Sequence, residues 1–259
     1  AGVIDTAWKD QVDGILLAYM PGQEAGDAVA DLLSGVANPS GKLAQTFPAS
    51  YTDVPSATSF AGVDTDSDGT VDTNYYNEGI YVGYRYYDTF NKSVSYPFGY
   101  GLSYTTFEYK DAKVASNTLD SKGAAGVVTL TATISNTGSV AGKEAAQVYI
   151  AAPTGTVAKP AIELKAFAKT AKLDAGSSES LTFTIPAKWL ASFDEANNQW
   201  IIDAGPYKAY VSPSSDVSST TPVTFTVSNK IVVSDTTSGA LALPSGVAES
   251  SFETTFTSN

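Results

Sequence analysis

The chain has 259 residues, 43% of them hydrophobic and 16% charged, a balance that suits one or two globular domains. Its formal net charge of −12 argues against a nucleic-acid partner, because affinity for a phosphate backbone comes mainly from Lys and Arg. Cysteine and histidine are absent, which excludes disulfides, thiolate or imidazole metal sites, and Ser-His-Asp or Cys-His catalysis within this chain. The 27 acidic residues leave carboxylate chemistry or the binding of a hard cation.

The sequence has no feature that predicts contact with a membrane. No apolar run approaches the roughly 18 residues of a membrane-spanning helix, and no signal-peptide pattern opens the chain. We therefore predict no membrane partner, and we expect Ala1 to be an interior residue of a longer polypeptide.

Residues 1–50 have the pattern of part of an α/β layer. The continuous apolar run at residues 15–20 predicts a strand that is buried on both faces of a parallel sheet. Apolar residues at helical spacing over residues 25–33 predict a helix, which Gly35 is placed to end. Residues 3–13 predict a short helix before the strand.

One strand and two helices cannot close a sheet. We therefore expect the missing layers to come from another chain or from polypeptide upstream of Ala1. The alternative is an independent helical hairpin over residues 1–35. The turn between strand and helix has two interpretations: Gln23 or Glu24 touches substrate, or Pro-Gly simply makes the turn and Glu24 complements the helix terminus.

An acidic loop at residues 64–72 has the ligand spacing of a calcium loop, with Gly69 at the sixth position. Its predicted oxygen ligands are the side chains of Asp64, Asp66, Asp68 and Asp72 and the carbonyl of Thr70. Tyr75 takes the place of the bidentate Glu at the twelfth position, so a looser calcium turn is expected, with Glu78 as one candidate for the missing acid. The alternative is a solvated acidic loop without a cation.

Residues 77–104 form an aromatic stretch that contains seven tyrosines, four glycines and Arg85. Tyrosines supply large contact areas with polar tips, and glycines let the backbone approach its neighbours closely. We predict that this stretch is a structural belt that holds neighbouring domains together. Arg85 is expected to pair with Asp88, because a buried Arg requires a partner.

From Val114 onward the apolar pattern changes to period two, which is typical of strands. About seven short strands separated by Gly, Pro and Asn turns predict a β-sandwich. The alternating segments lie at residues 128–134, 146–150, 181–185, 200–202, 207–211 and 223–227. The Ser- and Thr-rich tail has one clear apolar run at residues 240–244.

Several motifs occur in an order that resembles the C-terminal part of glycoside hydrolase family 3, and its β-glucosidases in particular. They are found at residues 21–24 (Pro-Gly-Gln-Glu), 38–43 (Asn-Pro-Ser-Gly-Lys-Leu), 46–48 (Thr-Phe-Pro), 76–88 and 96–104. Residues 135–144, 163–167 and 190–194 resemble the fibronectin type III-like domain of the same family and extend the likeness to about residue 233.

The resemblance implies an enzyme with a barrel, an α/β sandwich and a fibronectin type III-like domain, which retains anomeric configuration with an Asp nucleophile and a Glu acid/base. The barrel motif of the nucleophile does not occur here, and the acid/base Glu belongs before the Pro-Gly-Gln-Glu turn. We therefore assign no catalytic role to any residue. Glu78 belongs to the linker strand in the family's pattern. The resemblance also gives an alternative for the aromatic stretch, in which some of its rings line outer sugar subsites.

We predict an α/β fragment, part of an α/β sandwich, followed by an all-β immunoglobulin/fibronectin type III-like sandwich. The expected divisions are residues 1–50, the linker and belt at 51–112, the β-sandwich at 113–233 and the tail at 234–259.

The expected function is that of the C-terminal part of a retaining, exo-acting β-glucosidase in polysaccharide degradation, with oligosaccharides as substrates, structural calcium, and a barrel-containing catalytic segment or chain as partner. Alternatives are a non-catalytic glycan- or protein-binding module, a calcium-stabilised structural domain, and a β-xylosidase or N-acetylhexosaminidase. We expect a secreted or periplasmic location.

Overall fold

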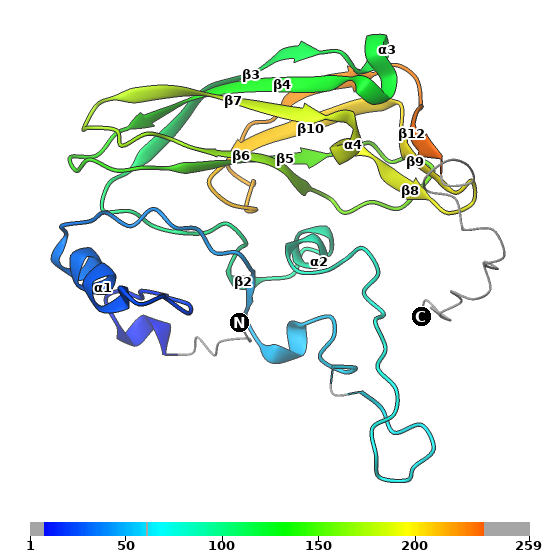
Figure 1. Cartoon of the computed structure of the whole chain (residues 1–259), viewed down its shortest axis with the longest axis horizontal. Coiled ribbons are helices and arrows are strands. Elements are labelled where there is room, and N and C mark those ends of the chain that lie inside the picture. Colours follow the sequence, from blue (N-terminus) through cyan, green and yellow to red (C-terminus); the bar gives the residue numbers. More distant parts are fainter. Residues whose placement is uncertain (1–7, 61, 236–259) are drawn as a thin grey trace.

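The computed structural model describes residues 8–60 and 62–235, and it places a long antiparallel β-sandwich above a part made of loops and short helices (Figure 1). The predicted tail and its apolar run at residues 240–244 lie outside the described residues. None of the helices in the described part is long and apolar enough to cross a membrane.

The part before the sandwich contains little regular structure. Its elements are η1 (Lys9–Gln11), α1 (Ala25–Ser34), β1 (Phe47–Pro48), η2 (Tyr51–Asp53), α2 (Tyr84–Thr89) and β2 (Val94–Tyr96). The predicted helix is confirmed as α1, and Gly35 ends it in the left-handed region, with φ 77° and its N–H donating to the Leu32 carbonyl. The predicted helix over residues 3–13 is reduced to the short turn η1 within the described residues.

The predicted strand at residues 15–20 is wrong for this chain on its own, because no strand lies between η1 and α1. A strand forms only where a neighbour accepts and donates its backbone hydrogen bonds, and β1 and β2 pair only with each other. The apolar residues remain exposed instead: Ile15 and Leu16 are nearly half exposed, and Met20 is 97% exposed.

The sandwich is confirmed and consists of two antiparallel sheets that face each other. The first has the order β3 (Phe107–Asn117), β4 (Val127–Asn136), β7 (Ser178–Pro186). The second has the order β11 (Val223–Val227), β10 (Gly205–Ser212), β5 (Ala145–Ala151), β6 (Glu163–Lys169).

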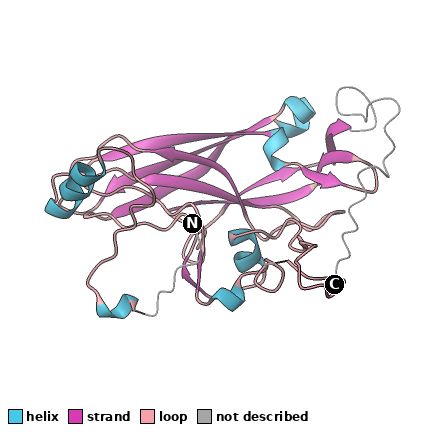
Figure 2. Cartoon of the chain, turned by 60° about the horizontal axis from the view of Figure 1, so that its bottom comes forward, coloured by secondary structure: helices cyan, strands magenta, loops and turns pink. Residues whose placement is uncertain are grey.

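A small third sheet continues the sandwich at one end, in the order β12 (Ile231–Asp235), β9 (Gln199–Ile202), β8 (Ser192–Asp194). The short helical turns α3 (Leu119–Lys122), η3 (Gly123–Ala125) and α4 (Ala187–Leu190) lie at the same end (Figure 2). Strands β3 and β12 cross the expected divisions at residues 113 and 233.

The core lies between the two large sheets, because alternate residues of each strand face inward. In β4 every second residue from Val128 to Ile134 is at most 1% exposed. Tyr207 of β10 stacks on Phe225 of β11 with ring centroids 5.1 Å apart, and its hydroxyl donates to the Asp203 carbonyl. The sandwich therefore has a closely packed hydrophobic core of its own.

Candidate functional site

The aromatic stretch at residues 77–104, here called the tyrosine belt, contains α2 and β2, which lie below the sandwich on the same side as α1 (Figure 1). Its helix α2 places Tyr84 against the sheet that contains β5. The Tyr84 ring stacks on Phe98 at 4.8 Å and meets Tyr149 edge-on at 5.9 Å. The Tyr84 hydroxyl accepts a hydrogen bond of 2.8 Å from the Leu164 N–H, and burial raises the pKa of the phenol.

Arg85 extends this contact as an ion pair with β6. Its Nε lies 3.2 Å from Oε1 of Glu163, and Lys165 Nζ lies 3.0 Å from the other oxygen of the same carboxylate. The expected pairing of Arg85 with Asp88 is therefore wrong. Residues three apart along a helix are near neighbours, but the fold brings Arg85 of α2 to a carboxylate on strand β6.

Asp88 lies on α2 and is half-buried against the loop that follows β10. Its Oδ2 atom and the hydroxyl of Ser215 are both buried without a hydrogen-bond partner of good geometry. Burial raises the pKa of Asp88 from 3.8 to about 6; contact with Ser215 offsets part of the rise, and the negative charge of Asp216 adds to it. This junction therefore contains a carboxyl group that titrates near neutral pH.

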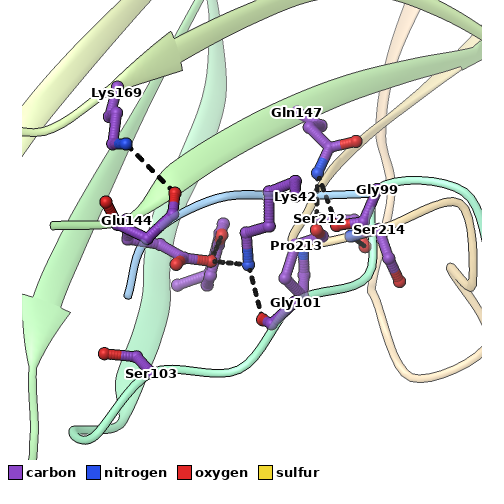
Figure 3. A network of polar contacts seen from close by, with 12 residues as sticks. Lys42, Gly99, Gly101, Ser103, Glu144, Gln147, Lys169, Ser212, Pro213 and Ser214 are labelled. Atoms are coloured by element: carbon purple, nitrogen blue, oxygen red, sulfur yellow. Dashed lines mark hydrogen bonds and ion pairs between the residues drawn. The ribbon is translucent and has the colours of Figure 1, made fainter. Parts of the chain in front are cut away.

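A buried ion pair anchors the residues before the belt (Figure 3). Lys42 Nζ lies 2.9 Å from Oε1 of Glu144 and donates to the Gly101 carbonyl at 3.1 Å. The Tyr109 hydroxyl donates to the same Glu144 oxygen at 2.7 Å. These contacts join three segments that are up to 102 positions apart in the sequence.

Gln147 forms the second anchor and holds the end of the belt. Its Nε2 donates to the carbonyls of Gly99 and Pro213, and its Oε1 accepts from the Tyr149 hydroxyl at 2.6 Å. Gly99 has φ 79°, and a Cβ atom there would lie 2.2 Å from the Gln147 side chain. Only glycine fits this position without displacing the amide.

An open groove of about 970 Å³ lies between the end of the belt, β3 and the loop that joins β10 to β11. The Lys42 and Glu144 pair lies on its wall. A smaller cavity of about 380 Å³ lies between residues 44–56 and the start of α2, and Glu78 and Arg85 line it.

The acidic loop brings together part of its predicted ligand set. The carboxylates of Asp64, Asp66 and Asp72 offer oxygen atoms that all lie within 4.8 Å of one another. Asp68 is not in this group; its Oδ1 accepts from the Thr70 N–H at 2.7 Å.

Hydrogen bonds within the loop already favour negative charge. The Gly69 N–H donates to Asp64 and the Thr65 hydroxyl donates to Asp72, and these bonds lower the pKa of both carboxyls. Gln23 and Glu24 are exposed, and neither residue lines the two cavities.

The sequence did not single out Glu144 or Gln147 as buried polar contacts, and it gave Asp88 the wrong partner. A faint signal existed for the first two, because both lie at or near the apolar segment around residues 146–150, where polar side chains need partners. Nothing in the sequence identified those partners, which lie 102 residues from Glu144 and 48 residues from Gln147.

Comparison with known proteins gives two family matches. Residues 1–84 match the Glycosyl hydrolase family 3 C-terminal domain, and residues 144–215 match the Fibronectin type III-like domain.

Individual relatives align with most of this chain but with a smaller share of their own length. An exo-alpha-(1->6)-L-arabinopyranosidase of Bifidobacterium longum is 42% identical over 83% of this chain and 27% of its own length. Beta-glucosidase A of Butyrivibrio fibrisolvens is 37% identical over 90% of the chain and 29% of its own length. The structure of beta-glucosidase 3B from Thermotoga neapolitana in complex with glucose is 46% identical with a TM-score of 0.77, covering 89% of this chain and 30% of that one. The chain thus spans less than a third of the length of these relatives.

The raised pKa of Asp88 predicts a pH-dependent stability. Between 3.8 and about 6 the native state retains a proton that the unfolded chain has released. The stabilisation is therefore fully present below pH 4 and is lost as the pH rises through 6. The free energy of unfolding of the parent and of Asp88→Asn can be measured in urea at several pH values. Relative to the parent, the variant should gain up to roughly 3 kcal/mol of stability between pH 4 and 7. A difference that does not change with pH would contradict this account of Asp88.

Proposed function

Because the chain belongs to glycoside hydrolase family 3 and corresponds to the C-terminal part of its members, we propose that it completes a retaining, exo-acting β-glucosidase. The enzyme would remove terminal β-D-glucosyl residues from oligosaccharides. The observation that carries the proposal is the 46% identity to a β-glucosidase whose fold the chain matches over 89% of its length.

We propose that both catalytic carboxylates come from a barrel-containing segment or chain. A retaining glycosidase needs two carboxyl groups about 5 Å apart, one with a raised pKa as the acid. Glu144 and Glu163 are each held by a lysine. The acidic loop brings carboxylates close together, but the hydrogen bonds to Asp64 and Asp72 lower their pKa values, which is the opposite of what a general acid requires.

We further propose that the same barrel-containing part covers the exposed apolar residues of the N-terminal segment. Met20, Leu33 and Val36 are 97%, 71% and 76% exposed, and such a concentration of exposed apolar side chains is typical of an interface. The belt would then contact the sandwich on one side and the catalytic part on the other.

A second activity is favoured by the relative from Bifidobacterium longum, which is named an exo-alpha-(1->6)-L-arabinopyranosidase and is 42% identical. An α-L-arabinopyranoside lacks the hydroxymethyl group of a β-D-glucopyranoside and carries its C4 hydroxyl in the opposite orientation. Discrimination between the two sugars therefore depends on residues around these two ring positions, and none of them is assigned to this chain.

The proposed activity predicts that the full-length protein hydrolyses 4-nitrophenyl β-D-glucopyranoside and releases β-glucose first, as followed by proton NMR. The matched substrate is 4-nitrophenyl α-L-arabinopyranoside, and the ratio of kcat/KM values decides between the two glycones. Release of α-glucose first would contradict a retaining mechanism, and no hydrolysis of any aryl glycoside would contradict the enzyme assignment.

We also propose that the acidic loop binds calcium as a structural ion. Three clustered carboxylates on one turn match the hard oxygen ligands that calcium prefers, and backbone carbonyls and water would complete the six to eight positions. A secreted or periplasmic location, which we also propose, would suit a weak site, because extracellular calcium modules bind at roughly 10⁻⁴–10⁻³ M. Cell fractionation tests the location; recovery in the cytoplasm would contradict it.

Calcium binding predicts a change on metal removal. After treatment with a chelator, the full-length protein should melt at a lower temperature, and added calcium should restore the original value. Calorimetric titration should show binding that is weakened about tenfold or more by Asp66→Asn. Asp68→Asn is the matched control, because Asp68 lies outside the cluster and should matter less. If titration of the parent protein with calcium gives no heat of binding, the proposed calcium site is contradicted.

A further inference from the structure

The open groove beside the belt has the Lys42 and Glu144 ion pair on its wall. The contacts described above do not fill the rest of its space. It lies where the end of the belt, strand β3 and the loop between β10 and β11 meet. Its volume of about 970 Å³ is at the upper end of the roughly 300–1,000 Å³ found for ligand pockets, so it has room for more than one sugar ring.

The groove lining is rich in hydroxyl groups. Tyr100 and Phe107 offer half-buried aromatic rings, which suit the apolar faces of a pyranose. The hydroxyl-bearing side chains that line it include Ser103, Thr106, Ser214, Ser219, Thr220 and Thr221.

The groove has a small excess of negative charge. Lys42 and Lys110 line it together with the carboxylates of Asp111, Glu144 and Asp216, and Lys110 is already paired with Glu108 at 2.7 Å. Lys42 and Glu144 already neutralise each other at 2.9 Å. With the net charge of −12 on the whole chain, this balance disfavours an anionic ligand and suits a neutral, hydroxylated one.

The walls of the groove are firmly held. Gly101 packs so closely on the Gly41 carbonyl that a Cβ atom would lie 2.3 Å from its oxygen. A bulge interrupts the pairing of β3 between Lys110 and Lys113, and Asp111 has φ 53°. Bulges of this kind re-aim side chains and are common beside functional sites.

We propose that this groove binds a neutral oligosaccharide of two or more sugar units. The choice of ligand class rests on the proposed function, but the site itself is defined by the residues named above. Its polar rim and aromatic rings would hold the chain of sugars along the end of the belt.

The test uses the full-length protein and a thio-linked, non-hydrolysable cellotetraose. Hydrogen exchange followed by mass spectrometry should show protection of residues 100–112 and 213–223 on addition of the sugar. Thr221→Trp places a large ring in the groove from an exposed rim position and should weaken sugar binding at these segments about tenfold or more. Thr224→Trp is the matched control, because Thr224 is exposed three residues away and does not line the groove.

Protection of both segments that Thr221→Trp abolishes and Thr224→Trp preserves would support the proposal. If the sugar does not protect these segments in the parent protein, the proposal is overturned. Equal sugar binding by the two variants would also overturn it. Hydrolysis of the aryl glucoside by the same preparation separates this failure from a failure of the enzyme assignment.

Discussion

The attachment of the N-terminal residues to the sandwich depends on the buried carboxylate of Glu144. It accepts from Lys42 and Tyr109 at 2.9 and 2.7 Å, and Lys42 in turn holds Gly101 of the belt. Both charged side chains are at most 13% exposed, so removal of one would leave the other buried without a partner. Such a change typically costs about 3–5 kcal/mol, far more than an exposed ion pair contributes.

The other contacts of the belt build on this anchor. Gln147 holds Gly99, Tyr84 packs on Tyr149, and Arg85 pairs with Glu163, all on the sheet formed by β5, β6 and β10. One sheet of the sandwich thus fixes the belt from Tyr84 to Gly101. The sandwich is therefore a scaffold that positions residues 38–42 and 84–104, in agreement with the absence of any assigned catalytic pair in the described part of the chain.

Local patterns were sufficient to predict the elements that depend on local physics. The spacing over residues 25–33 and Gly35 predicted α1, and alternation predicted the strands of the sandwich. The strand at residues 15–20 failed because its hydrogen-bonding neighbours are not in the described chain. The Arg85 partner was missed because Glu163 lies 78 residues away, and only the folded sandwich brings it near. The acidic loop brings three of its four Asp carboxylates within 4.8 Å of one another, because turn geometry is also local, and calcium binding there stays a prediction.

Lys42 and Glu144 act as one unit that fixes the belt to the sandwich. A double-mutant cycle with Lys42→Met, Glu144→Leu and the double variant, measured by urea unfolding of the full-length protein, tests it directly. The account predicts that each single change is strongly destabilising and that the double variant recovers more than about 1 kcal/mol of the summed losses. Losses that add to within about 0.5 kcal/mol would contradict it, because independent residues behave in that way.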